Sequence, residues 1–155
     1  MKNFQNKHVL ITGGARGIGK QIGVEFAKKG ANIIICDLDK QFFNPEEFKS
    51  NVKDIENLGV QCFGYQLDVT NVEEIKTTRD KILKDIGKID IIVNNAGIVF
   101  GGKFLELSID QHKKTYDVNT QGIINMLHVF LPDLITQRES HIVNIASASG
   151  FTALP

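Results

Sequence analysis

Short apolar runs and amphipathic helical segments alternate along the whole chain, and this alternation restricts the fold more than any other feature. The apolar runs predict strands, and each interval between two runs carries apolar residues at helical spacing. Strands that are apolar on both faces and alternate with helices form parallel sheets with right-handed crossovers. The pattern predicts an α/β fold, a doubly wound parallel sheet that ends after its fifth strand, in one domain over residues 1–155. The expected strands are 8–12, 32–36, 60–67, 89–93 and 141–146, and the expected helices are 17–29, 45–58, 72–86 and 108–137, the last broken once and bent at Pro132.

The charge balance and the cysteines limit the classes of partner. Eighteen basic and eighteen acidic residues give a formal charge of zero, so we expect no nucleic-acid partner. Cys36 and Cys62 are the only cysteines, and each lies within an apolar run, so we expect buried reduced thiols and no metal site. The chain lacks an apolar stretch of the roughly 18 residues that span a bilayer, and its start lacks a signal-peptide core, so we expect no transmembrane segment and a cytoplasmic location.

A glycine-rich string, TGGARGIG at residues 12–19, joins the first expected strand to the first expected helix. In such a turn the first glycine permits a tight bend, the second lets a pyrophosphate approach the backbone, and the third lets helix and strand pack closely. The phosphates would meet free N–H groups at the positive end of the helix dipole. Asp37, which follows the next strand, supplies the acid expected of a dinucleotide site. The residues predicted to contact the cofactor here are Gly13, Arg16, Gly17, Ile18 and Gly19.

The spacing of these glycines, TGxxxGxG, resembles that of the short-chain dehydrogenase/reductase family. Other motifs agree, and they lie at the carboxyl ends of expected strands, where open α/β sheets bind ligands. The resemblance covers essentially the whole chain. It implies a Rossmann-type sheet with strand order 3-2-1-4-5 and an NAD(P)-dependent oxidoreductase that transfers hydride between a nicotinamide cofactor and an alcohol or ketone. The agreeing motifs are Asp37, Asp68-Val69, Asn94-Asn95-Ala96-Gly97, Ser147 and the internal Asn119.

The resemblance also implies roles for the cofactor residues. Asp37 would accept hydrogen bonds from the adenosine ribose hydroxyls and repel a 2′-phosphate, which favours NAD, with NADP less favoured. Arg16 argues the other way, because a basic residue at this place often accompanies NADP. Asp68 and Val69 would contact the adenine, although Asp68 also fits a helix cap. The other expected contacts are Asn95, which would also stabilise the central strands, with Ala96 and Gly97.

Ser147 and Asn119 match the family's catalytic positions. Ser147 would polarise the substrate oxygen, although a strand-ending hydroxyl is the simpler alternative and Ser149 lies nearby. Asn119 would sit at a helix distortion and order a water molecule linked to the family's lysine.

The family's Tyr-x-x-x-Lys motif, which supplies the general acid/base, is expected beyond Pro155. Tyr65 and Tyr116 do not match this motif, because Val69 and Thr120 stand four positions after them. We therefore expect a chain that lacks the catalytic Tyr/Lys segment and does not turn over substrate by itself. A non-catalytic nucleotide-binding or interaction module is the alternative, and a full-length form is expected to be a homo-oligomer.

Overall fold

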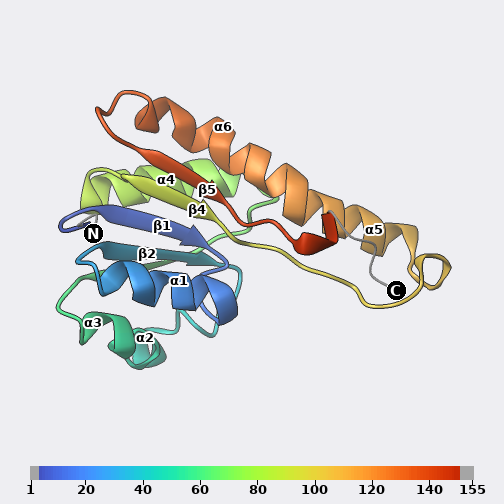
Figure 1. The fold of residues 1–155 in the computed structure, drawn as a ribbon, viewed down its shortest axis with the longest axis horizontal. Helices are drawn as coiled ribbons and strands as arrows, with labels where there is room; N and C mark the ends of the chain where they lie inside the picture. Colours follow the sequence, from blue (N-terminus) through green and yellow to red (C-terminus); the bar gives the residue numbers. More distant parts are fainter. Residues whose placement is uncertain (1–3, 151–155) are drawn as a thin grey trace.

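A five-stranded parallel sheet runs through the molecule in a computed structural model that describes residues 4–150 (Figure 1). The strand order is β3-β2-β1-β4-β5, as expected. The strands β3, β4 and β5 are shorter than the sequence predicted. β5 is short because, within the described chain, it pairs only with β4, along Ile91–Asn94. The strands are β1 His8–Thr12, β2 Asn32–Asp37, β3 Cys62–Gln66, β4 Ile91–Asn94 and β5 His141–Asn144.

Helices cover the two faces of the sheet and enclose two apolar cores. Side chains alternate between the faces of a strand, so Leu10 packs into one core while Val9 and Ile11 pack into the other. All three are fully buried, and burying such a side chain stabilises the fold by about 1.5–3 kcal/mol. One core lies under α1 Gly17–Ala27, α2 Pro45–Asn51 and α3 Lys53–Glu56, and the other under α4 Val72–Ile86 and α6 Gly122–Leu134.

Two of the expected helices are interrupted, and the sequence did not predict the first of these interruptions. The segment 45–58 divides into α2 and α3 because Val52 has non-helical backbone angles and a fully buried side chain. The long region does break once, but at a π turn, Asp117–Gln121, between α5 Ile109–Tyr116 and α6. Pro132 does not interrupt α6, since the helix continues through it to Leu134. Two short 3-10 turns, Phe104–Glu106 and Ala148–Gly150, complete the elements.

The amino end of α4 is capped and is also joined to the end of β3. Asn71 caps the helix, because its side-chain oxygen accepts a hydrogen bond from the Glu74 N–H at 3.2 Å. The Glu74 carboxylate accepts from the backbone N–H of Asp68 at 3.0 Å, so it ties the end of β3 to the helix.

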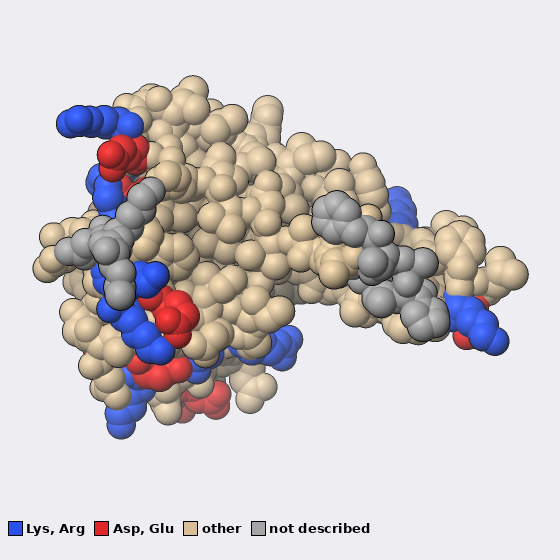
Figure 2. All heavy atoms as spheres, viewed as in Figure 1, with Lys and Arg blue, Asp and Glu red and all other residues tan. Residues whose placement is uncertain are grey.

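The strand β5 is exposed on both faces in the described part of the chain. Ile142, Val143 and Ile145 are each more than a third exposed, although all three are apolar. Figure 2 shows few charged side chains over β4, β5 and α6, whereas charges gather at the end of the molecule that carries the loop before β5. No helix within residues 4–150 is long and apolar enough to cross a membrane.

Candidate cofactor site

The glycine turn has a shape that requires three of its glycines for different reasons. Gly13 and Gly17 have φ angles of +63° and +56°, in the left-handed region that favours glycine. A Cβ on Gly19 would lie 2.2 Å from the Gly13 carbonyl oxygen, so only glycine lets α1 pack against the turn. A Cβ on Gly17 would meet no atom within 4 Å, so the backbone there borders open space. The turn therefore offers an exposed backbone at the start of α1, which is where a phosphate would bind.

Thr12 and Asn95 join the ends of β1 and β4 beneath this turn. The buried Thr12 hydroxyl accepts hydrogen bonds from the backbone N–H groups of Asn95 and Ala96, both at 3.0 Å. The Asn95 side-chain amide donates to the carbonyl oxygens of Thr12 at 3.1 Å and Gly13 at 3.0 Å. Asn95 thus has the strand-joining role that was expected, and it also fixes the first glycine of the turn.

Asp37 lies half-buried at the carboxyl end of β2, beside the turn. One carboxylate oxygen accepts from the Ala15 N–H at 3.1 Å, and the other accepts from the Asp39 N–H at 3.2 Å. A carboxylate oxygen has two acceptor positions, so each keeps one for a ligand hydroxyl. Both contacts orient the carboxylate against the glycine turn.

Asp68 and Val69 follow β3 on the other side of the cleft. The Asp68 carboxylate accepts from the Thr70 N–H at 2.9 Å and from its hydroxyl at 2.7 Å, so Asp68 stabilises the turn before α4, while Asn71 is the cap. Val69 is buried, and its carbonyl oxygen accepts from the side chain of Asn125 on α6 at 3.0 Å. This buried contact holds α6 against the end of β3.

Asn119 lies in the π turn, so the expected helix distortion is present. Its side-chain oxygen accepts from the Ile98 N–H at 2.8 Å, and its amide donates to the Ile98 carbonyl at 2.9 Å. A Cβ on Gly97 would lie 3.5 Å from the same side-chain oxygen. Asn119 therefore holds the loop after β4 next to the cleft.

These elements border a cleft of about 750 Å³ at the carboxyl ends of the strands. Every predicted cofactor residue except Gly17 lines it. Nine further residues line the cleft, and none of them belongs to a sequence motif that would have marked it as a cofactor contact. They are Leu38, Leu67, Thr70, Ile98, Val99, Phe100, Lys114, Asp117 and Val118.

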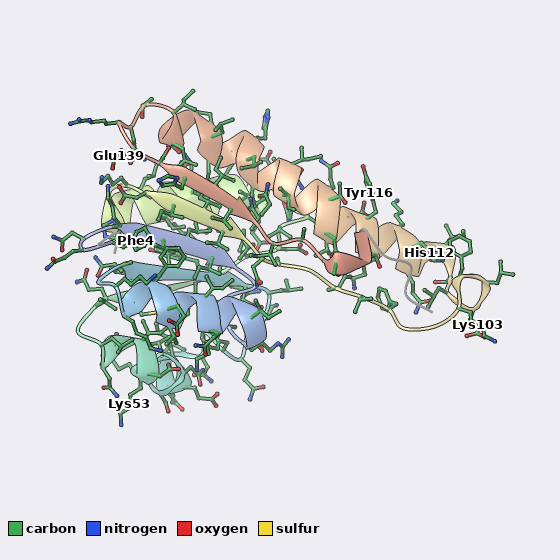
Figure 3. All side chains as sticks on the ribbon, in the orientation of Figure 1. Phe4, Lys53, Lys103, His112, Tyr116 and Glu139 are labelled. Atoms are coloured by element: carbon green, nitrogen blue, oxygen red, sulfur yellow. The ribbon has the colours of Figure 1, made fainter. Side chains whose placement is uncertain are left out.

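The two expected catalytic positions do not line this cleft. Asn119 reaches it through Ile98. Ser147 follows β5 and is exposed, and its carbonyl oxygen accepts from the Gly150 N–H at 3.0 Å. The side chain of Ser149 and residues 151–155 lie outside the described structure. Figure 3 shows the exposed Tyr116 on α5, near the π turn.

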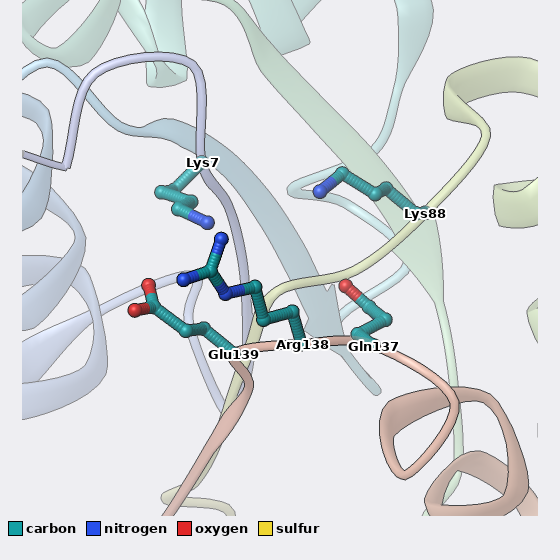
Figure 4. Close-up of a pocket in the computed structure, with 5 residues that line it drawn as sticks. All are labelled: Lys7, Lys88, Gln137, Arg138 and Glu139. Atoms are coloured by element: carbon teal, nitrogen blue, oxygen red, sulfur yellow. The ribbon is translucent and has the colours of Figure 1, made fainter.

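A second hollow, of about 460 Å³, lies at the opposite end of the sheet and is distinct from the cleft (Figure 4). Lys7 and Lys88 at its rim both contact the buried Asp90 carboxylate, at 3.2 and 2.8 Å. Burial alone would raise the pKa of Asp90, but hydrogen bonds from Lys88, the His8 N–H and Lys7 outweigh it and hold the pKa below its ordinary value. The hollow is therefore built around an ion-pair network that links β1 to β4. Its lining residues are Lys7, Lys88, Gln137, Arg138 and Glu139.

Neither cysteine has reactive character. Cys36 and Cys62 are buried and free, and burial raises the pKa of the Cys62 thiol to about 12 and that of Cys36 further. A search of residues 4–150 finds no group of three His, Cys, Asp or Glu side chains that could hold a metal ion.

The chain matches known proteins along nearly all of its length. The family model described as short chain dehydrogenase matches residues 7–155. The reductase FabG of Thermotoga maritima, a 3-oxoacyl-acyl-carrier-protein reductase, is 35% identical over 98% of this chain and 60% of its own length. The human 17-beta-hydroxysteroid dehydrogenase 13 is 33% identical over 99% of this chain and 50% of its own length. The chain thus spans about half to three-fifths of the length of these relatives.

Solved structures agree with this match. An NAD+-bound xylitol dehydrogenase has a TM-score of 0.85 at 30% identity, over 99% of this chain and 58% of its own. The carveol dehydrogenase of Mycobacterium avium, in complex with NAD, has a TM-score of 0.86 at 27% identity, over 100% of this chain and 59% of its own. The fold, the glycine turn and these matches together identify the chain as a member of the short-chain dehydrogenase/reductase family of oxidoreductases, with the Rossmann-type fold of that family.

Proposed function

We propose that this chain binds NAD in the cleft at the carboxyl ends of its strands, as the nucleotide-binding part of an oxidoreductase. The observation that carries this proposal is the glycine turn at the start of α1, which borders the cleft and whose Ala15 N–H donates to the Asp37 carboxylate at 3.1 Å. The two solved relatives with NAD support the same cofactor. When bound, the nicotinamide would supply a hydride acceptor or donor for an alcohol or ketone substrate.

Different lining residues would contact different parts of the dinucleotide. The backbone of Gly13, Arg16, Gly17, Ile18 and Gly19 would hold the pyrophosphate, since α1 directs its free N–H groups and positive dipole end there. Asp68 and Val69 would flank the adenine, and Asn95, Ala96 and Gly97 would border the cofactor near the middle of the sheet. The free acceptor positions of Asp37 would take the ribose hydroxyls.

The carboxylate of Asp37 supports NAD over NADP. A 2′-phosphate at this ribose would bring a group of about −1.5 to −2 charge beside a fixed carboxylate. Two negative charges about 4 Å apart at a partly buried surface repel by about 4 kcal/mol at an effective dielectric of 20. Only a cation able to neutralise the phosphate would reverse this preference.

Ser147 and Asn119 would serve the substrate side of the site. We assign to Ser147 the hydrogen bond to the substrate oxygen. Asn119 would support the loop at Ile98 and would also order a water molecule. Residues 1–155 hold no Tyr-x-x-x-Lys motif, so by themselves they would bind nucleotide without turnover.

A homo-oligomeric full-length form stays part of the proposal. Several large apolar side chains are exposed on α5, on α6 and just after it, and they support it because exposed apolar surface can mark interaction sites. These residues are Ile109, Tyr116, Ile124, Leu131 and Ile135.

The cytoplasmic location stays a prediction.

Calorimetric titration of the folded chain with NAD tests the cofactor assignment. Asp37→Ala should weaken NAD binding by roughly 10-fold or more, because hydrogen bonds to a charged acceptor are worth about 1.5–3 kcal/mol. Asp54→Asn is the matched control, since Asp54 pairs with Lys20 and does not line the cleft. A folded wild-type chain without affinity for NAD would overturn the proposal.

A further inference from the structure

Arg16 occupies an unusual electrostatic position at the mouth of the cleft. It is the residue immediately before α1, and its side chain is 80% exposed. A cation at this end of a helix is disfavoured by the dipole, and the first turn of α1 contains no acidic residue to offset it. In the described structure the negative charge that pairs with Arg16 comes from another element.

Asp39, two residues beyond the end of β2, supplies that charge. Its Oδ2 lies 3.6 Å from the Arg16 guanidinium. Its Oδ1 accepts from the backbone N–H groups of Gln41 at 3.1 Å and Phe42 at 3.4 Å. The carboxylate is thus held in place by its own turn, whereas the long Arg16 side chain extends into solvent and pairs with it.

Asp39 is also joined to the ribose-side acid. Its backbone N–H donates to the Asp37 carboxylate at 3.2 Å. The end of β2 therefore presents two linked carboxylates around one cation, with a formal charge of −1 from the three side chains.

We propose that Asp39 is a positioning residue for nucleotide selectivity, which acts by pairing with Arg16. In the pair, the guanidinium is neutralised and is directed toward the turn after β2. A 2′-phosphate would have to compete with Asp39 for Arg16 and would also meet the repulsion of both carboxylates. A ribose with free hydroxyl groups has neither cost. This inference rests on the proposed binding of a nicotinamide dinucleotide in the cleft.

Asp39→Asn separates this role from a purely structural one. The asparagine oxygen can still accept from the Gln41 and Phe42 N–H groups, so the turn is kept while the charge is removed. The freed Arg16 then becomes available to a 2′-phosphate. Affinity for NADP should rise roughly 3- to 10-fold, the range expected for an exposed ion pair with one repulsive charge removed. Affinity for NAD should change by less than about 2-fold, since its ribose carries no charge.

The experiment is a double-mutant cycle with Arg16→Gln, measured as NAD and NADP dissociation constants of the 155-residue chain at low and high ionic strength. Arg16→Gln in the wild-type background removes the guanidinium while it is paired with Asp39, and its effect on NADP affinity is the reference for the cycle. In the Asp39→Asn background it should cancel most of the gain. The gain should also shrink at high salt, since the charges are exposed. Asp54→Asn controls for net charge, and thermal unfolding followed by circular dichroism controls for the fold.

The outcomes separate this inference from the proposed function. A folded wild-type chain that binds neither NAD nor NADP overturns both. A chain that binds NAD, but whose NADP-to-NAD affinity ratio is unchanged by Asp39→Asn, overturns the role of Asp39 alone. A gain that is equal with arginine or glutamine at position 16 also overturns it, because simple charge removal would then explain the effect.

Discussion

Gly19 and Gly23 lie one helical turn apart in α1, and alanine at these two positions should have opposite effects. Alanine in place of glycine within a helix gains about 1 kcal/mol of helix propensity at either site. At Gly23 the added Cβ would lie 3.4 Å from Ile11 Cδ1 and Ile33 Cγ2, which is ordinary van der Waals contact. Gly23→Ala should therefore leave the free energy of unfolding unchanged or raise it by up to about 1 kcal/mol.

At Gly19 the same methyl group meets polar atoms that cannot withdraw. It would lie 2.2 Å from the Gly13 carbonyl oxygen and 2.5 Å from Asn95 Nδ2, which themselves form a hydrogen bond. Overpacking of this kind costs about 1–3 kcal/mol. Displacement of the Asn95 amide would weaken two hydrogen bonds worth about 1 kcal/mol each. After the propensity gain, we expect Gly19→Ala to lower the free energy of unfolding by about 2–4 kcal/mol.

Urea denaturation followed by far-ultraviolet circular dichroism measures both variants, with the slope m as a check that the transition remains two-state. NAD titration of the folded fraction of Gly19→Ala should show weakened binding, because the turn is displaced. A Gly19→Ala midpoint equal to or above that of Gly23→Ala would refute the reasoning, since it would mean that the turn moves aside at no cost.

Two ion-pair networks give further tests. Asp90→Asn should lower the free energy of unfolding at pH 7 by about 1–3 kcal/mol, since Lys7, Lys88 and the His8 N–H lose a charged acceptor. Because the pKa of Asp90 is lowered in the fold, its contribution is present above the unfolded pKa of about 3.9 and is lost as pH falls through the folded value. Urea midpoints of wild type and variant should thus converge as pH falls below the unfolded pKa, and a constant difference would contradict the ionic explanation. Arg79→Lys should lower the free energy of unfolding by about 0.5–1 kcal/mol, because lysine cannot reproduce the two hydrogen bonds from Arg79 to Asp133 that join α4 to α6. Urea denaturation measures this variant too, and an unchanged midpoint would mean that the pair contributes nothing to stability.

The alternation of strands and helices and the glycine turn could be predicted because local patterns specify them, whereas the strand order came from the family resemblance. The expected strands are short, mainly apolar runs, and the residues after each strand meet at one edge of a parallel sheet. Asp37, Asp68 and Asn95 were placed correctly at the cleft for this reason. The pattern could not reveal which hydrogen bonds these residues make within the protein. Asp68 accepts from Thr70, and Asn95 donates to the carbonyl oxygens of Thr12 and Gly13.

One break in the region 108–137 was expected, and the family resemblance implied a distortion at Asn119. The break between α2 and α3 escaped prediction because it depends on tertiary packing. Apolar residues at 48, 52, 55 and 58 fit one continuous helix, but the burial of Val52 ends α2 and begins α3. A π turn at 117–121 inserts extra backbone without altering the apolar character of the sequence. Such a turn shifts the phase of the preceding helix, and so the contact of Lys114 with the cleft could not be derived from periodicity.

The bonds between Thr12 and Asn95 have a consequence for the order of events during synthesis. The glycine turn lies near the start of the chain, yet Gly13 receives its fixing hydrogen bond from a residue 82 positions later. Closing so long a loop costs entropy before any contact offsets it. Asn95 must therefore leave the ribosome exit tunnel before the turn can take its final shape. Nascent chains halted before Asn95 emerges should lack affinity for the nucleotide. Once β4 has joined β1, nucleotide would bind only the closed form and would draw the growing chain toward it by mass action.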